Sequence, residues 1–417
     1  MATDLFTPVL NDRTRSVRFF NGRLLSGEAM SEEQGGLRAA RELLAQAVGD
    51  GVVQGLDVQE AVGASTTQSP IVTVSAGLAL NRRGEALLLP ADTQVRLVRP
   101  AHPSTAPPSL FQTCTPPTQG VYVADSGVYL LTVASLGVAN GLAAVSGLGG
   151  LTTSCNADTV VAAVQFRLLE LPVDTALLAD PRLRNLVAYQ CFGIDDAADF
   201  ATDPLATTVE PHTLLDQARD AQQLTDCDVP LAALYWTATG GIQFLDRWSV
   251  RRRVTRAALR PSLALDDLRL AVAEARAQQF QDQIADLARA GTLTVTTDAT
   301  SLFRYLPPAG LLPLPHGALG GASYASFFAA ATCRGPAFVL DARLSALLTA
   351  ALAYAPIDLA SRELIWLYLG VANTQRANAP APTAAQGFVA FVHGAVEYAA
   401  NARFDLGRLN FANYARI

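Results

Sequence analysis

Lysine is missing from the 417-residue sequence, so arginine supplies all 31 of its basic side chains. Without lysine the chain can carry out no lysine Schiff-base chemistry and has no lysine for a phosphate-binding loop. Only 16% of the residues are charged and 50% are hydrophobic, whereas an average soluble protein has roughly 25% charged residues. Because so little charge is present to cover the outside of a monomer, we expect part of the surface to be buried against other chains.

The net charge of −6 argues against a nucleic-acid partner, since phosphates favour a basic face. The cysteines are odd in number and never form a C-x-x-C pair, which predicts scattered reduced thiols in a cytosolic protein. The first residues lack an apolar core, so no secretory signal is expected. Two long stretches, 126–157 and 305–333, have no acidic or basic side chains apart from His316. They are interrupted by glycines and prolines respectively, so neither is predicted to span a membrane.

Catalytic motifs are also missing. The chain has four histidines and contains no H-E-x-x-H, G-x-S-x-G or EF-hand pattern. Two clusters of carboxylates are present, Asp195–Asp196 with Asp199 and Asp266–Asp267, but the second pair lies where a helix dipole favours negative charge. We therefore predict no catalytic, cofactor-binding or metal-binding residues and a protein that is not an enzyme.

Hydrophobic periodicity predicts the elements of the first half. A helix is expected from Ser26 or Ser31 to Val48, with Met30, Leu37, Leu44 and Val48 on one face. Residues 71–80 and 85–90, joined by the polar turn 81–84, are typical of a β-hairpin. Valine-rich and leucine-rich segments beginning at 121 and 160 predict further strands.

The predicted fold class is α+β. Residues 1–255 are expected to form a mostly-β, sandwich-like domain with the early helix and a proline-rich loop at 99–120. A connecting helix is expected within 256–292, whose heptad-like seam from Ala273 to Leu287 needs a partner surface. Residues 293–417 are expected to form a mainly helical domain, because the apolar run 344–357 has a length that suits a buried helix.

The segment ALYWTATGGIQFLDRWSVRRRV, residues 233–254, combines two tryptophans, a Gly-Gly pair and four arginines. Alternation on both sides of the glycines predicts a hairpin with an aromatic face. Three interpretations of the arginine run stay open: a solvated strand end paired with local acids, a protein interface, or a nucleic-acid contact with tryptophan platforms. The candidate interface residues of the whole chain are Phe19, Phe20, Trp236, Trp248, Arg251, Arg252, Arg253 and Trp366.

An ordered set of phrases gives the chain a family resemblance. The phrases are RFFNGRLLSGEAMSEEQ, GVVQGLDV, VTVSAGLALNRRGEALLLP, SCNADTVVAAVQFRLLEL, LRNLVAYQCFG, VPLAALYWTATGGIQFLDRWSVRRRV, FRYLPPAGLLP and IDLASRELIWLYL. Together they resemble a family of large bacterial proteins associated with phage-tail-like contractile injection particles. The sequence departs from that family in its early helix, where a strongly basic, aromatic character is reduced to ARELLAQAV.

The resemblance implies a non-enzymatic structural part of the baseplate or a tail appendage, assembled in several copies with other subunits of the particle. It implies assembly in the cytoplasm followed by incorporation into the particle. Two alternatives are a receptor-binding or carbohydrate-binding appendage with an exposed aromatic platform, and a hydrolase that uses an unrecognised carboxylate pair.

Overall fold

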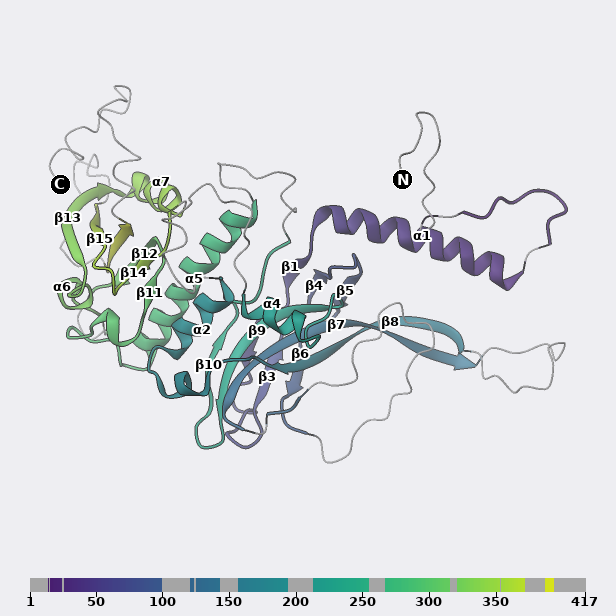
Figure 1. The fold of residues 1–417 in the computed structure, drawn as a ribbon, viewed down its shortest axis with the longest axis horizontal. Helices are drawn as coiled ribbons and strands as arrows, with labels where there is room; N and C mark the ends of the chain where they lie inside the picture. Colours follow the sequence, from purple (N-terminus) through teal and green to yellow (C-terminus); the bar gives the residue numbers. More distant parts are fainter. Residues whose placement is uncertain are drawn as a thin grey trace, which may run out of the picture.

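The computed structural model describes residues 14, 16–24, 26–99, 121–123, 125–142, 157–193, 213–254, 267–315, 321–352, 354–371 and 387–393. These residues form an N-terminal part and a C-terminal part, each with two hydrophobic cores, and the parts meet at a junction that includes one long helix (Figure 1). The two candidate carboxylates Asp195 and Asp196 lie outside the described residues, and so do residues 100–120 of the proline-rich loop. The predicted domain boundaries at 255 and 292 stay predictions.

The N-terminal part begins with a helix and continues in short antiparallel strands. The helix α1 runs from Gly27 to Val48, and its N-cap Ser26 accepts a hydrogen bond from Ala29 N at 3.1 Å. Two three-stranded sheets follow, ordered β1-β4-β5 and β2-β3-β6. Their strands are β1 Gly51–Gly55, β2 Val58–Glu60, β3 Ile71–Val74, β4 Gly77–Leu80, β5 Ala86–Leu89 and β6 Thr93–Arg96. The predicted helix is confirmed, and so is the hairpin across turn 81–84, but its first strand is only β4; residues 71–74 form β3 in the other sheet.

A four-stranded antiparallel sheet, ordered β10-β9-β7-β8, forms the centre of the molecule. Its strands are β7 Gly127–Leu142, β8 Ala157–Glu170, β9 Asp228–Thr237 and β10 Gly241–Asp246. Side chains alternate along β7, because successive residues of a strand point to opposite faces. Tyr129, Leu131 and Val133 join the core with β1–β6, whereas Val128 and Leu130 join a second core. This second core is covered by η1 Thr175–Ala179, α2 Leu183–Cys191 and α4 Leu214–Asp220.

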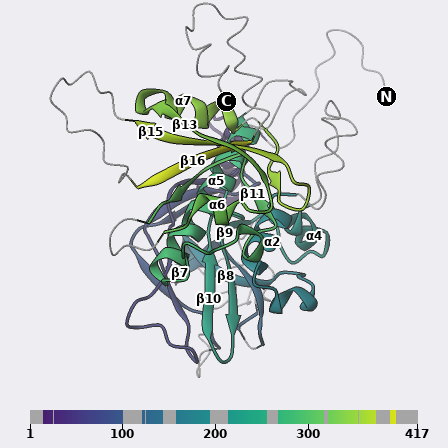
Figure 2. The same cartoon turned by 90° about the vertical axis from the view of Figure 1, so that its left-hand side faces the viewer.

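The C-terminal part is a mixed sheet covered by helices, so the predicted mainly helical domain at 293–417 is wrong. Its four-stranded sheet has the order β12-β16-β15-β13, and β13 pairs with β15 in parallel (Figure 2). The sheet strands are β12 Ala309–Pro313, β13 Thr332–Leu340, β15 Leu364–Val371 and β16 Phe388–His393. The remaining elements are α5 Asp267–Arg289, η2 Ala299–Ser301, β11 Tyr305–Leu306, α6 Tyr324–Phe327, α7 Asp341–Ala351 and β14 Ile357–Asp358.

Helices cover both faces of this C-terminal sheet. Phe280 and Ile284 of α5 lie in one core with Ile365 and Leu367 of β15, while Leu344 of α7 lies in the other with Trp366. The heptad-like seam of α5 therefore finds its partner surface in this chain. Strands buried on both faces read as continuous apolar runs and lose the alternation that identifies a strand. The apolar run 344–357, on which the helical prediction was based, does contain α7, but LIWLYLGV is a strand run without alternation, and no sequence pattern identified it as a strand.

Candidate functional site

The arginine run lies at a corner of the fold, which we call the arginine corner, residues 246–253. The predicted hairpin is confirmed as β9 and β10, and β10 ends at Asp246. Asp246 Oδ1 accepts hydrogen bonds from the backbone N–H groups of Trp248 and Ser249, each at 3.0 Å, and this turns the chain sharply. The turn directs the following arginines toward neighbouring segments of the same chain.

Arg251 ties the corner to the link between β1 and β2. Its guanidinium donates to Asp57 Oδ1 and to the backbone carbonyl of Gly55, both at 2.5 Å. Arg247 lies 3.6 Å from the same Asp57 carboxylate and 3.4 Å from Asp282 of α5. Asp57 is thus shared by two arginines, and the acids satisfy both of them within the chain.

Arg252 ties the corner to α2. Its guanidinium donates to the carbonyl oxygens of Ser249 at 2.8 Å and Cys191 at 3.2 Å, and it lies 5.3 Å from the ring centroid of Phe192. Arg276 of α5 also lies over that ring, 5.5 Å from its centroid. Burial lowers the pKa of Arg252 and lowers that of Arg276 to about 10, because both charges are partly removed from water.

Arg253 is the exposed member of the run. Its side chain is 67% exposed and lies 3.3 Å from Glu274 of α5. Its backbone is held, because Val52 N donates to the Arg252 carbonyl at 2.8 Å and β1 forms an isolated parallel bridge at Arg253. Of the three arginines, only Arg253 offers much charge to a partner, so the geometry favours the interpretation of local pairing for the run as a whole.

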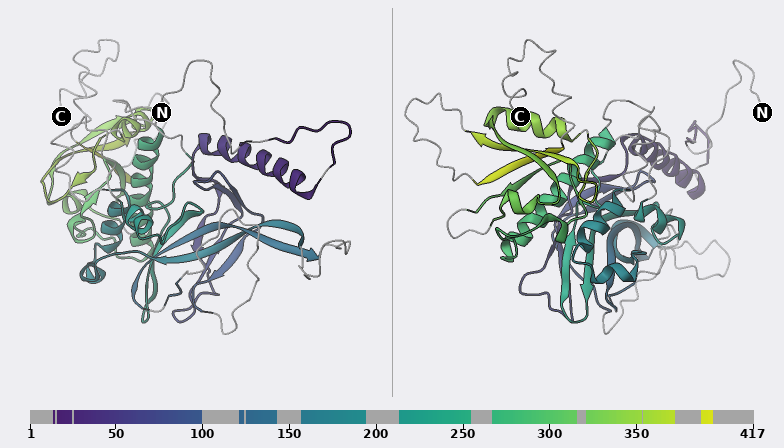
Figure 3. Two further views of the ribbon diagram at one scale, coloured as in Figure 1. Left: turned by 45° about the vertical axis from the view of Figure 1, so that its right-hand side comes forward. Right: turned by 60° about the vertical axis from the view of Figure 1, so that its left-hand side comes forward.

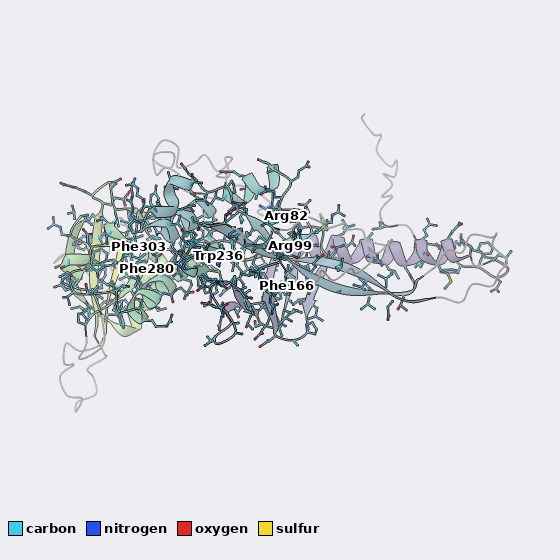
Figure 4. The ribbon with its side chains drawn as sticks, turned by 90° about the horizontal axis from the view of Figure 1, so that it is seen from below. Arg82, Arg99, Phe166, Trp236, Phe280 and Phe303 are labelled. Atoms are coloured by element: carbon cyan, nitrogen blue, oxygen red, sulfur yellow. The ribbon has the colours of Figure 1, made fainter. Side chains whose placement is uncertain are left out.

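The three tryptophans belong to the interior or to this corner. Trp236 and Trp366 are buried in the N-terminal and C-terminal cores, and Figure 4 shows Trp236 in the middle of the molecule. Trp248 is half-buried, donates from Nε1 to Asp282 at 2.6 Å and carries the Arg247 guanidinium 5.1 Å from its ring centre. No tryptophan is therefore placed as an open platform.

Phe19 and Phe20 are exposed, as an interface requires, and lie in the segment before α1. The structure adds a neighbouring feature that sequence reasoning missed as a candidate site. Met30, Leu37, Leu44 and Val48 of α1 are 54%, 53%, 71% and 52% exposed. Their shared face could be predicted from their spacing, but the spacing does not indicate whether that face is buried or exposed. We call these four residues the α1 stripe.

A second exposed apolar feature is the distal ribbon, residues 135–142 of β7 paired with 157–164 of β8. The pairing of β9 with β7 ends at Ala134, so β9 does not extend along this part of the hairpin. Val138, Val160 and Val161 are exposed on it. Figures 1 and 3 show the ribbon and α1 projecting from the same side of the body. The ribbon forms because β7 and β8 extend beyond their neighbours in the sheet. The lengths of strands relative to one another depend on the whole fold, so no local sequence pattern identified the ribbon.

The remaining candidates for catalysis or metal binding are histidines and carboxylates. His393 lies 2.7 Å from Glu363, while His102, His212 and His316 fall outside the described residues, as do Asp199 and Asp266. Within the described ranges, no three His, Cys, Asp or Glu side chains gather as a metal site would need, and no helix has the length and apolar character to cross a membrane.

The cysteines differ in part from the expected reduced thiols. Cys227 is disulfide-bonded, so the expectation is wrong at that position, while Cys191 and Cys333 are free. Burial raises the pKa of the Cys191 thiol to about 12 and that of Cys333 to about 11. A thiol with so high a pKa is a poor nucleophile at neutral pH.

Comparison with known proteins adds no family: a scan against protein-family models and a search of curated proteins each found no match to this chain.

Proposed function

We propose that this chain is a non-enzymatic structural component of a phage-tail-like contractile injection particle, associated with the baseplate and acting through protein–protein contacts. The proposal rests on the sequence resemblance, and one structural observation carries it further. Two elements, α1 and the distal ribbon, project from a body whose cores are already closed, and both expose apolar side chains.

The exposed side chains of these projections support an assembly role. Contiguous apolar surface on a soluble chain marks an interaction site, and interfaces use such surface at their centres. An isolated two-stranded ribbon is at best marginally stable in water, so a neighbour that covers residues 135–142 and 157–164 would stabilise it. Projections of this kind suit a subunit that holds other subunits together.

The proposed partners are other subunits of the particle, and the proposed course is assembly in the cytoplasm followed by incorporation. A disulfide at Cys227 fits a particle that works outside the cell, because disulfides persist in oxidising surroundings. The sparse charge of the sequence fits burial against neighbours.

Mass spectrometry of particles purified from the source organism tests this proposal. We expect the chain to sediment with tube and sheath proteins and to stay with them at high salt, since apolar contacts are little screened by ions. Recovery of the full-length chain only in the free soluble fraction, with particles present and lacking it, would contradict the proposal.

A carbohydrate-binding appendage remains the second candidate, because Phe19 and Phe20 are exposed side by side in sequence. A glycan array with the full chain separates the two candidates. A scaffold should give no saturable binding, whereas saturable binding lost in a Phe19→Ala, Phe20→Ala variant would favour the appendage.

A further inference from the structure

The α1 stripe runs the length of the helix on the side turned away from the body. Met30, Leu37 and Leu44 are spaced by seven residues and Val48 follows four later, so at 3.6 residues per turn all four lie within about 20° of Leu37 around the helix axis. Each is more than half exposed. The four exposed side chains are therefore spread over about five turns, with Met30, Leu37 and Leu44 about two turns apart.

The body holds α1 by the opposite face. A Cβ added to Gly84 would lie 2.2 Å from the Glu42 carbonyl oxygen, so the turn 81–84 packs directly on the helix backbone there. Gln46 Nε2 donates to the Arg83 carbonyl at 2.8 Å. Around the helix axis, Glu42 and Gln46 lie about 140° and 180° from Leu37. The contact between α1 and the turn 81–84 therefore leaves the stripe exposed. The helix already packs on the body through its other face, so the stripe is not needed for that packing.

The charges of α1 are unevenly placed along its length. Its first half carries Glu28, Glu32 and Glu33 with no arginine, and its second half carries Arg38 and Arg41 with Glu42. Glu33 and Arg41 lie one turn before and one turn after Leu37, on the two flanks of the stripe. Glu28 and Glu32 lie about 180° and 140° from Leu37 around the helix axis and point away from the stripe, so Glu33 and Arg41 are the charges nearest to it. Glu33 Oε2 also accepts a hydrogen bond from Val17 N at 2.6 Å.

We propose that a second copy of this chain covers the stripe, through an antiparallel α1–α1 pair centred on Leu37. Met30 and Leu44 are equidistant from Leu37, so the Met30 of each copy meets the Leu44 of the other. Glu33 of each helix then lies beside Arg41 of its partner, and the helix dipoles oppose. A parallel pair would instead place the Arg41 side chains of both copies side by side. This inference rests on the proposed assembly role and names one partner for it.

Disulfide trapping in the full chain tests the orientation. In a background carrying Cys333→Ser, which removes an exposed thiol, we expect Leu37→Cys to form a covalent dimer under mild oxidation. Met30→Cys and Leu44→Cys should each stay uncrosslinked alone and form a mixed dimer when combined, because only an antiparallel pair brings these two positions within disulfide reach. Val295→Cys, a half-exposed valine in the C-terminal part, is the matched control and should stay uncrosslinked.

Light scattering of the same chain tests the strength of the pair. We expect the wild-type chain to be a dimer and Leu37→Glu to raise the dissociation constant roughly 100-fold, because it places a charge in the apolar contact. Val295→Glu should leave the dimer unchanged, and circular dichroism should show both variants folded. Leu44→Glu provides a second position on the stripe.

Two outcomes overturn the inference. A wild-type chain that is monomeric at high concentration shows that a different partner, or none, covers the stripe. Crosslinking of Met30→Cys with itself shows a parallel pair. Neither outcome touches the proposed function, because incorporation into particles is measured separately by their composition.

Discussion

At the scale of single residues, the arginine corner shows how one sequence run divides into different roles. Arg251, Arg252 and Arg253 are identical in type and adjacent, yet two of them are used in ties to β1 and α2 and one is largely exposed. Composition alone leaves three interpretations open here, namely pairing with local acids, a protein interface and a nucleic-acid contact. The carboxylate of Asp57, almost 200 residues earlier, and the carbonyl of Cys191 could not be placed beside the run from the sequence.

Alanine substitution should separate these roles. We expect Arg252→Ala to lower the free energy of unfolding by about 2–3 kcal/mol, because it removes hydrogen bonds from a charged donor to otherwise covered carbonyl groups. Arg253→Ala should cost under about 1 kcal/mol, as is typical of an exposed ion pair. Urea unfolding measures both. Equal losses for the two variants would show that the corner does not tie the chain as described. Charge reversal of the whole run is accordingly expected to destabilise the isolated fold.

At the scale of elements, the long periodic segments could be predicted and their neighbours could not. The helix at 27–48 begins after a serine cap and ends at Gly49, a glycine with positive φ, so its ends and its apolar face are local information. Whether the apolar face meets a core depends on what the rest of the chain places beside it. The four residues of the α1 stripe carry the same pattern as a buried helix and are exposed.

The contact between Gly84 and α1 can be tested with a matched pair of glycines. Gly84 and Gly63 both have positive φ, 83° and 78°, but an added Cβ would meet the Glu42 backbone at Gly84 and nothing within 4 Å at Gly63. Gly63→Ala should therefore lower the free energy of unfolding only by the backbone strain, about 1 kcal/mol. Gly84→Ala should cost at least about 2 kcal/mol, because the close approach adds overpacking to the strain.

Hydrogen exchange supplies the distinguishing readout for this pair. We expect Gly84→Ala to speed exchange in 27–48 selectively, while strands β7 and β9 keep their protection. If Gly63→Ala produced the same change, the turn at 81–84 would not be what holds the helix.

At the scale of the whole molecule, the N-terminal and C-terminal parts meet at a small polar junction. Asn185 of α2 is buried, donates to the Tyr305 carbonyl at 2.9 Å and accepts from the backbone N–H groups of Arg304 at 2.8 Å and Tyr305 at 3.0 Å. Beside it, Tyr189 stacks on Tyr305 with centroids 5.1 Å apart. One side chain thus satisfies three backbone groups of the C-terminal part from a helix of the N-terminal part.

Removing that side chain should uncouple the two parts. We expect Asn185→Ala to split a single calorimetric unfolding transition into two, because three buried polar groups lose their partner at the junction. Asn81 is equally buried but bonds within the turn 81–84 and to Cys227, so Asn81→Ala should lower the stability of the N-terminal part without splitting the transition. A single transition in Asn185→Ala, merely shifted, would contradict this role.

Several strands of the first half were predicted and those of the C-terminal sheet were missed for one physical reason. Strands β7 and β8, and β9 and β10, pair with close sequence neighbours, so their patterns are informative, although β9 also pairs with the distant β7. In the C-terminal sheet, Ala309 of β12 pairs with Val392 of β16, and parallel β13 and β15 are separated by α7. Pairings over such distances, between strands covered on both faces, leave no period in the sequence. Trp236 and Trp366 were chosen as interface candidates by residue type, which does not indicate whether a side chain is buried. Both are buried in the structure.

The attachment of α1 has a mechanical consequence. The helix is about 33 Å long and is gripped at Glu42 and Gln46, near one end. It therefore behaves as a lever, in which a tilt of about 10° at the grip would swing the far tip by about 4–5 Å. Such an arm can reach a range of docking positions and tolerate neighbours set at slightly different angles, while the body behind it stays unchanged.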